Sequence, residues 1–234
     1  MKILASDYDG TLNYNGIDDK KRMALEKWRT AGNLFGIVSG RGLDTLMEMV
    51  RNDQIICDFL LACSGAVICN QKGQILKETR CDGKYAHSII QALFQLNCKV
   101  AYVQFPFTHT IMSDDPIPEV SYFNQISTIL DTFEEAASVT ASIQEQFKEI
   151  VTPLQNGRCI DIVPIGMNKA EGLYQLLAVL NAKYEDLIVV GDNINDLDMI
   201  TEFHSYAVEN ALPEVKKQAD AVVFGVTELI EKEL

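Results

Sequence analysis

Short apolar runs alternate with longer amphipathic segments at both ends of the chain. At the amino end the pattern predicts strand, helix, strand, helix, strand and hairpin, over residues 2–6, 18–30, 34–38, 43–51, 59–63 and 67–78. At the carboxyl end helices and strands alternate over residues 170–181, 187–190, 196–201, 206–208, 213–219 and 221–224, before a short terminal helix. Strands that alternate with helices imply parallel pairing, so the predicted fold is α/β with a doubly wound parallel sheet.

The middle of the chain breaks this alternation. The stretch between Arg41 and Lys169 is far longer than the roughly 30 residues of a βαβ unit. Within it the pattern predicts a helix, a strand, a loop rich in Pro and Asp, helical stretches and a closing strand, over residues 84–96, 99–104, 106–118, 121–148 and 159–163. We interpret residues 81–165 as an inserted α+β domain, which leaves residues 1–80 and 166–234 as the core domain.

Polar motifs stand directly after three of the predicted strands. They are Asp7-Tyr8-Asp9-Gly10-Thr11, Ser39-Gly40-Arg41 and Gly191-Asp192-Asn193-Ile194-Asn195-Asp196. Because ligands of parallel sheets bind beyond the carboxyl ends of the strands, we expect these groups to meet at one edge of the sheet. Lys169, at the start of a predicted helix, can neutralise phosphoryl charge there. This mixture predicts a magnesium-dependent phosphoryl transfer through an aspartyl phosphate.

Each motif taken alone also has an ordinary structural explanation, so the prediction of phosphoryl transfer rests on their combination. Two carboxylates at i and i+2, such as Asp7 and Asp9, can bind a cation, divide nucleophilic from acid/base work, or merely belong to a solvated loop. The Ser39 hydroxyl and Gly40 amide can hold phosphate oxygens at a helix start, or form a simple turn. The 191–196 string offers hard oxygen ligands to magnesium and could also serve only as a turn and helix cap.

Composition and charge narrow the class of partner. The 234-residue chain carries a net charge of −13 with a pI near 4.6, and this acidity argues against a nucleic-acid partner. No run approaches the roughly 18 apolar residues of a membrane span, and the amino end lacks the pattern of a signal peptide. The six cysteines are scattered without CxxC spacing, which predicts buried reduced thiols rather than disulfides or a zinc site. We therefore expect a cytoplasmic protein with no nucleic-acid or membrane partner.

Taken together, the motifs resemble those of the haloacid dehalogenase (HAD) superfamily. The matching features are DxDGT at 7–11, a serine that ends the second strand at 39, a helix lysine at 169 and GDxxND at 191–196. The large insert between the second and third of these motifs resembles the Cof-type subfamily, as do Ser64-Gly65-Ala66 and Asn210-Ala211. The resemblance implies a Rossmann-like core with an inserted α+β cap of type C2B (the type-IIB cap). Ser64 departs from the pattern, because the family usually has asparagine there.

The resemblance also implies a role for each matching residue. Asp7 would be the nucleophile and Asp9 the general acid/base. Magnesium would be held by the Asp7 carboxylate, the Asp9 backbone carbonyl and Asp192. The phosphoryl group would be bound by Ser39, Gly40, Lys169 and Asn195. Supporting roles would fall to Thr11, Arg41 and Asp196.

The expected function is a magnesium-dependent phosphatase, with a sugar phosphate as the substrate that the resemblance implies. A phosphotransferase or phosphomutase of the same superfamily is the nearest alternative, in which a sugar hydroxyl replaces water. A signalling receiver domain is more distant, because a receiver has its phosphorylated aspartate after the third strand and Leu60-Leu61-Ala62-Cys63-Ser64 contains none. A catalytically inactive binding protein fits poorly, since no expected carboxylate is missing. The oligomeric state is left open by the sequence.

Overall fold

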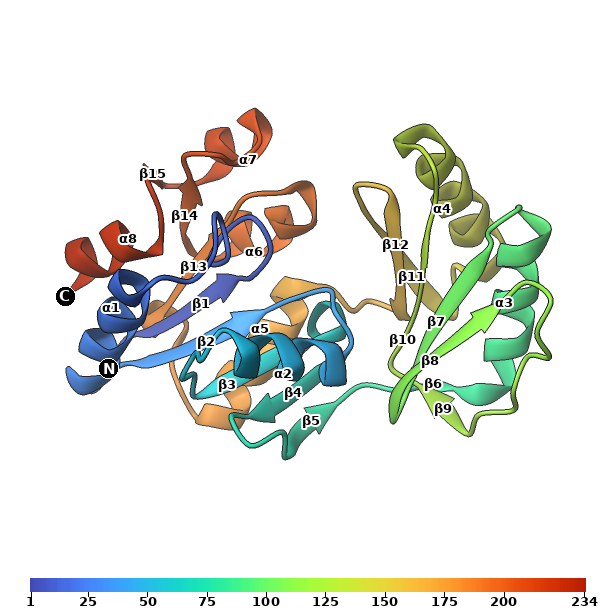
Figure 1. The fold of residues 1–234 in the computed structure, drawn as a ribbon, viewed down its shortest axis with the longest axis horizontal. Helices are drawn as coiled ribbons and strands as arrows, with labels where there is room; N and C mark the ends of the chain where they lie inside the picture. Colours follow the sequence, from blue (N-terminus) through green and yellow to red (C-terminus); the bar gives the residue numbers. More distant parts are fainter.

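An eight-stranded sheet is built from the two ends of the chain, in the computed structural model that describes residues 1–234 (Figure 1). Six neighbouring strands pair in parallel, in the order β15 (Ala221–Val223), β14 (His204–Val208), β13 (Leu187–Gly191), β1 (Ile3–Asp7), β2 (Leu34–Val38) and β3 (Phe59–Ala62). The sheet is completed by two antiparallel strands, β4 (Val67–Asn70) and β5 (Ile75–Glu78). The predicted doubly wound α/β sheet is confirmed.

Helices cover both faces of this sheet, which explains why its central strands are continuous apolar runs. Every residue of β1 and β13 is buried. The helices are α1 (Asp19–Thr30), α2 (Leu43–Asn52), α5 (Lys169–Leu180), α6 (Leu197–Glu202), α7 (Pro213–Gln218) and α8 (Val226–Glu233). The Asp18 side chain accepts a hydrogen bond from the Lys21 N–H and so caps α1.

The middle of the chain forms a second, antiparallel sheet beside the first (Figure 1). Its order is β11 (Val151–Asn156), β12 (Cys159–Pro164), β10 (Gln125–Ile129), β7 (Val100–Phe105) and β8 (Phe107–Met112). The helices α3 (Ala86–Gln95) and α4 (Phe133–Phe147) pack against it, and β6 (Cys81–Asp82) pairs with β9 (Tyr122–Phe123). Because side chains alternate along a strand, Ile160 and Ile162 enter the core under the helices while Cys159 and Asp161 line the opposite face.

Two predictions for this middle region are wrong, and one strand was not foreseen. The predicted loop at 106–118 contains the strand β8, and the predicted helical stretch at 121–148 begins with β9 and β10 before α4. The strand β11 was not predicted, and it contains Pro153, a residue that is unusual within a strand. Its position at the edge of the sheet explains why the proline is tolerated there.

Two separate hydrophobic cores lie within the molecule. The larger core lies between the parallel sheet and the helices that cover its two faces. The smaller core lies between the antiparallel sheet and its helices. Val163, near the end of β12, belongs to the larger core. All six cysteines are free thiols, five of them buried. No helix combines the length and apolar character needed to cross a membrane.

Candidate active site

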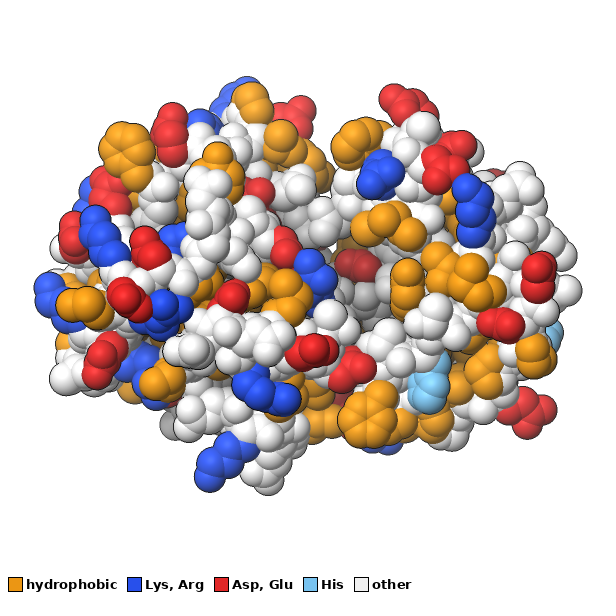
Figure 2. Space-filling view, in the orientation of Figure 1, with side chains coloured by type: hydrophobic (Ala, Val, Ile, Leu, Met, Phe, Trp, Pro, Cys, Tyr) orange, Lys and Arg blue, Asp and Glu red, His pale blue; other side chains and the backbone are white.

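A cleft of about 500 Å³ lies where the carboxyl edge of the parallel sheet meets the open face of the antiparallel sheet. Figure 2 shows the molecule hollowed between its two lobes, with acidic and basic side chains gathered at the mouth. From the parallel sheet it is lined by Asp7, Asp9, Ser39, Gly40, Arg41, Gly42, Thr45, Asn193 and Asn195. The predicted motifs therefore do meet at one edge of the sheet.

Asp7, at the end of β1, is bound to Lys169 at the start of α5. The Lys169 Nζ donates to Asp7 Oδ1 at 2.7 Å and to Asp196 Oδ1 at 2.6 Å, and the lysine side chain is only 1% exposed. Burial alone lowers the pKa of Lys169, but the carboxylates of Asp196 and Asp7 more than offset that effect and raise it above its usual value. Lys169 is therefore a fixed positive charge beside Asp7.

Asp196 holds the loop that follows β13 in place. Its Oδ2 accepts hydrogen bonds from the backbone N–H groups of Asp192 at 2.9 Å and Asn193 at 3.1 Å, while its Oδ1 accepts from Lys169. A Cβ on Gly191 would lie 2.6 Å from Asp196 Cβ, so only glycine fits at that position. Both carboxylate oxygens of Asp196 thus accept hydrogen bonds that hold the loop and Lys169, in keeping with a supporting role.

Asp192 faces the loop that follows β1. The Thr11 Oγ1 donates to Asp192 Oδ1 at 2.7 Å, and a Cβ on Gly10 would lie 2.5 Å from Asp192 Oδ2. Gly10 also has a φ of +86°, which favours glycine, and its carbonyl accepts from Asn210 Nδ2 at 2.8 Å. The two loops are therefore locked together with the Asp192 carboxylate between them.

The charge balance of this cluster fits a divalent cation. Asp7, Asp192 and Asp196 bring carboxylate oxygens within 4.8 Å of one another, and Lys169 is the single ammonium among them. Two negative charges are left over, and Asp7 Oδ2 is buried without a hydrogen-bond partner. Burial raises the pKa of Asp7, and the ion pair with Lys169 offsets this only in part. The cluster could bind a metal ion, because a divalent cation would supply the missing charge and a partner for the orphaned oxygen.

Asp9 points away from this cluster to Arg41. The Arg41 Nε and Nη2 donate to the two oxygens of the Asp9 carboxylate at 2.7 and 2.8 Å. This two-pronged pairing fixes the orientation of the carboxylate at the rim of the cleft, where both side chains are partly exposed. The contact of Arg41 with Asp9 fits the supporting role predicted for Arg41.

The predicted phosphate-binding groups flank Asp7. Ser39 is buried at the end of β2, and its Oγ accepts from the Arg41 N–H at 3.2 Å. Gly40 and the half-buried Asn195 line the cleft on either side. The structure therefore brings every predicted site residue into one neighbourhood.

Sequence reasoning assigned no site role to any individual residue that the antiparallel sheet contributes to the cleft. These residues are Tyr102, Thr108, Gln125, Ser127, Thr128, Ile129, Asn156, Cys159 and Asp161. One signal was available: Asp161 interrupts the apolar strand Cys159–Pro164, and a buried charge in such a run usually has a purpose. Gln125 and Ser127 lie two residues apart on β10 and hence on one face, but that short pattern falls inside the stretch predicted to be helical.

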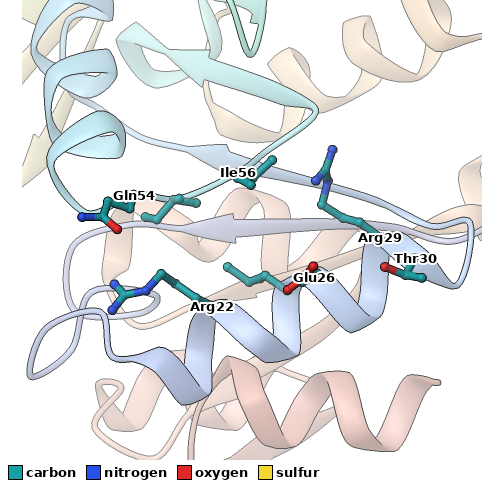
Figure 3. Close-up of a pocket in the computed structure, with 8 residues that line it drawn as sticks. Arg22, Glu26, Arg29, Thr30, Gln54 and Ile56 are labelled. Atoms are coloured by element: carbon teal, nitrogen blue, oxygen red, sulfur yellow. The ribbon is translucent and has the colours of Figure 1, made fainter.

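A second hollow, of about 470 Å³, lies between α1 and the segment that follows α2. Figure 3 shows α1 on one side of it, with Gln54 and Ile56 from the segment after α2 on the other. Its two cations are already paired, since Arg22 binds Asp19 and Arg29 binds Asp58. We therefore place the functional site in the first cleft.

Comparison with known proteins identifies the family of the chain. The sequence profile of haloacid dehalogenase-like hydrolases matches residues 4–115 and 101–228, so the chain belongs to that family. It is 26% identical to a phosphoglycolate phosphatase of Methanothermobacter thermautotrophicus, over 99% of this chain and 98% of the relative. It is 25% identical to the 5-amino-6-(5-phospho-D-ribitylamino)uracil phosphatase YcsE of Bacillus subtilis, over 95% of this chain and 89% of the relative.

Solved structures agree in fold. A HAD/COF-like hydrolase from Plasmodium vivax superposes with a TM-score of 0.82 at 20% identity, over all of this chain and 95% of that one. The resemblance to HAD hydrolases of the Cof type, with a Rossmann-like core and a cap, is therefore confirmed. The protein is an enzyme, a phosphatase of this family.

Proposed function

We propose that the protein is a magnesium-dependent phosphatase that hydrolyses a small phosphorylated metabolite through an aspartyl phosphate on Asp7. The observation that carries this proposal is the position of Asp7, which lies at the floor of the cleft between a buried ammonium and a second carboxylate. We extend it to a sugar phosphate as the substrate class, which the family resemblance supports.

In the first half of the reaction, a carboxylate oxygen of Asp7 attacks phosphorus and the bond from phosphorus to the leaving oxygen breaks. Asp9 gives its proton to that oxygen, so the alcohol leaves neutral. Lys169 neutralises part of the charge on the phosphoryl oxygens, and Ser39 and Gly40 hold those oxygens beside Asp7.

In the second half, water attacks phosphorus and Asp9 takes the proton that the water loses. The bond between Asp7 and phosphorus breaks, which returns a free carboxylate and inorganic phosphate. Arg41 is the positioning residue in both halves, because its fork keeps the Asp9 carboxylate at the rim of the cleft.

A magnesium ion would be held by the carboxylates of Asp7 and Asp192, with the Asp9 carbonyl as a further candidate. When bound, it would withdraw charge from the phosphoryl oxygens and so stabilise the transition state. Asp196 already accepts three hydrogen bonds, so we assign it the role of orienting the loop that carries Asp192.

We further propose that residues 81–165 act as a cap that recognises the leaving group. The motifs of the parallel sheet surround only the phosphoryl position, so they cannot distinguish one ester from another. The antiparallel sheet forms the remaining wall of the cleft, where the leaving group would lie.

The direct test is phosphate release from a panel of phosphate esters, with magnesium and with a chelator. We expect release only with magnesium, with one alcohol formed per phosphate, and mass spectrometry of rapidly quenched enzyme should find the added phosphoryl group on Asp7. Products in which phosphate has moved to a second hydroxyl would show a phosphotransferase instead.

Metal binding can be tested without turnover. Magnesium should raise the melting temperature of the wild-type protein, because a ligand that binds only the folded state stabilises it. Asp192→Asn should lose most of that increase, whereas Asp114→Asn, at an exposed aspartate of the turn after β8, should retain it. An equal increase in both variants would contradict the proposed metal site.

A further inference from the structure

The wall that the antiparallel sheet gives to the cleft contains hydroxyl, amide and carboxylate groups but no basic side chain. Its residues are Tyr102, Thr108, Gln125, Ser127, Thr128, Ile129, Asn156, Cys159 and Asp161. The one cation that lines the cleft is Arg41, and both prongs of its guanidinium are engaged by Asp9. An anionic substituent on the leaving group of the substrate would therefore have no free cationic side chain to pair with in this wall.

Gln125 is the best-defined group of this wall. Its Nε2 donates to the Gly40 carbonyl at 2.8 Å and to Asp161 Oδ1 at 2.9 Å. Since both partners are acceptors, the nitrogen and oxygen of the amide are unambiguously assigned. The other atom, Oε1, is therefore an acceptor, and it is buried without a hydrogen-bond partner in the protein. Buried acceptors are almost always paired, and Gln125 lines the cleft, so a molecule bound in the cleft could supply the donor.

Asp161 lies next to Gln125 and directly above the phosphate-binding loop. Its Oδ1 accepts from Gln125, and its Oδ2 accepts from Ser64 Oγ at the long distance of 3.3 Å. A Cβ on Gly40 would lie 2.5 Å from Asp161 Oδ2, which shows how closely the carboxyl approaches that loop. The first atoms of a leaving group attached to a phosphate at this loop would therefore lie near Asp161.

We propose that Gln125 and Asp161 form a subsite that accepts hydrogen bonds from a hydroxyl or amino group of the leaving alcohol. The subsite rejects leaving groups that carry a carboxylate or a second phosphate. This rests on the proposed phosphatase function and deepens it. The substrate class is then the phosphate ester of a polyol, a sugar or an amino sugar. A carboxylate in the same place would lie beside Asp161 without a counter-charge, which is unfavourable in a partly buried cleft.

The sharpest test compares two phosphate esters that differ only in whether the leaving group ends in a hydroxyl or in a carboxylate. Glycerol 3-phosphate ends in a CH₂OH group where 3-phosphoglycerate has a carboxylate. We expect the wild-type enzyme to favour the former by about 10–100-fold in kcat/KM. Because the ratio is measured on one enzyme preparation, it is independent of the fraction of active protein.

Two variants assign the preference to this wall. In assays well above pH 7, where Asp161 is ionised because burial raises its pKa to about 7, Asp161→Asn removes the negative charge. Ser127→Lys places a positive charge directly opposite Asp161, its register partner between β10 and β12. Both should lower the ratio of kcat/KM for glycerol 3-phosphate to kcat/KM for 3-phosphoglycerate by at least about fivefold. Asp114→Asn, a matched change on the exposed surface of the same region, should leave this ratio unchanged. A ratio that is equally unaffected in all three variants would overturn the subsite.

Failure of this inference is distinguishable from failure of the proposed function. An enzyme that hydrolyses esters but prefers 3-phosphoglycerate would overturn the subsite and leave the phosphatase intact. An enzyme that hydrolyses no ester would overturn the function. Calorimetric binding of the two esters to Asp7→Asn reads the same preference without turnover, and tighter binding of 3-phosphoglycerate would overturn the subsite by itself.

Discussion

At the scale of single residues, the site concentrates more negative charge than its one buried ammonium can balance. Asp7, Asp192 and Asp196 share Lys169, and Asp7 keeps an unpartnered oxygen. Such an arrangement is unfavourable for folding and is retained at functional sites because the chemistry needs it. Replacing Asp7, whose second oxygen has no partner, should therefore lower activity and leave stability unchanged or increased.

Asp7→Asn should abolish turnover, because an amide of nearly the same size is a poor nucleophile. In the presence of a chelator its melting temperature should equal or exceed that of the wild-type protein, since one of three crowded carboxylates has become neutral while Lys169 keeps Asp196 as its partner. Steady-state assays and thermal melts measure both effects. Activity above about a tenth of the wild-type value would exclude Asp7 as the attacking group.

Asp9→Asn should separate the two halves of the reaction. With an activated ester such as p-nitrophenyl phosphate, the leaving group needs no proton, so Asp7 should still become phosphorylated. Release of phosphate should slow by about 10²–10⁴-fold, the usual contribution of a general acid/base. Quenched-flow measurement of enzyme-bound and free phosphate separates the two steps. If phosphorylation of the enzyme and release of phosphate slowed equally for activated and unactivated esters, the role assigned to Asp9 would be wrong.

Asp161 should make the stability of the protein depend on pH. Burial raises the pKa of this carboxyl to about 7, and a hydrogen bond from Ser64 and the charges of Lys169 and Arg41 lower it only partly. Because the folded-state pKa lies above the unfolded value, the stabilising contribution is fully present below about pH 4 and is lost as the pH rises through 7. The shift of about three pKa units corresponds to roughly 4 kcal/mol at most.

Asp161→Asn removes this titration. Urea unfolding of both proteins between pH 4 and 8 should show nearly equal free energies of unfolding at the acidic end and a growing advantage of the variant as the pH rises. A constant difference across that range would show that Asp161 does not titrate as described. The contributions of all other groups cancel in the comparison, since both proteins share them.

At the scale of elements, the position of Lys169 depends on how closely α5 approaches the turn after β3. The 3₁₀ turn Cys63–Gly65 and α5 contact each other through two glycines, and a Cβ on Gly172 would lie 2.5 Å from Gly65 Cα. Alanine at 172 would gain about 1 kcal/mol in helix propensity. Overpacking against a backbone that cannot move aside costs about 1–3 kcal/mol and should prevail.

Gly172→Ala should therefore lower the melting temperature and, because α5 is displaced, lower activity as well. Gly225→Ala is the matched control, since no atom lies within 4 Å of the added Cβ and its φ of 169° is ordinary extended backbone. Thermal melts and assays of the two variants measure the difference. Equal behaviour of both variants would show that α5 can shift without affecting the site.

Elements of the parallel sheet were predictable from sequence for a physical reason. Strands such as β1 and β13 are buried on both faces and end in a polar motif, so their type and boundaries can both be recognised locally. The strands of the antiparallel sheet place polar residues such as Gln125 and Asp161 on their cleft face, so their apolar runs are interrupted, and β11 even contains Pro153. The site divides in the same way: Asp7 and Asp192 stand at strand ends, whereas Gln125 and Asp161 reach the cleft only through the packing of one sheet against the other.

At the scale of the whole molecule, the two lobes are joined mainly by polar contacts around the cleft. On one side Thr108 Oγ1 donates to Asp44 Oδ1 at 2.6 Å, and on the other Asn193 Nδ2 donates to Asn156 Oδ1 at 3.3 Å. Each lobe has its own hydrophobic core, and Val163 is the point where β12 enters the larger one. Small polar contacts between separate cores permit relative motion, which is what a closing cap requires.

Exchange of residues 82–162 for the corresponding segment of a relative should accordingly change the preferred phosphate ester and leave the chemistry unaltered. This boundary keeps Val163 in the larger core and removes Gln125 and Asp161 together with the rest of the wall. The chimera should still need magnesium and Asp7, because the parallel sheet provides every group that surrounds the phosphoryl position. The measurement is kcat/KM across one ester panel for the two parents and the chimera, with Asp7→Asn in the chimera as the control for contaminating activity. A folded, active chimera that keeps the ester ranking of the original core would place specificity in the parallel sheet and contradict the role of the cap.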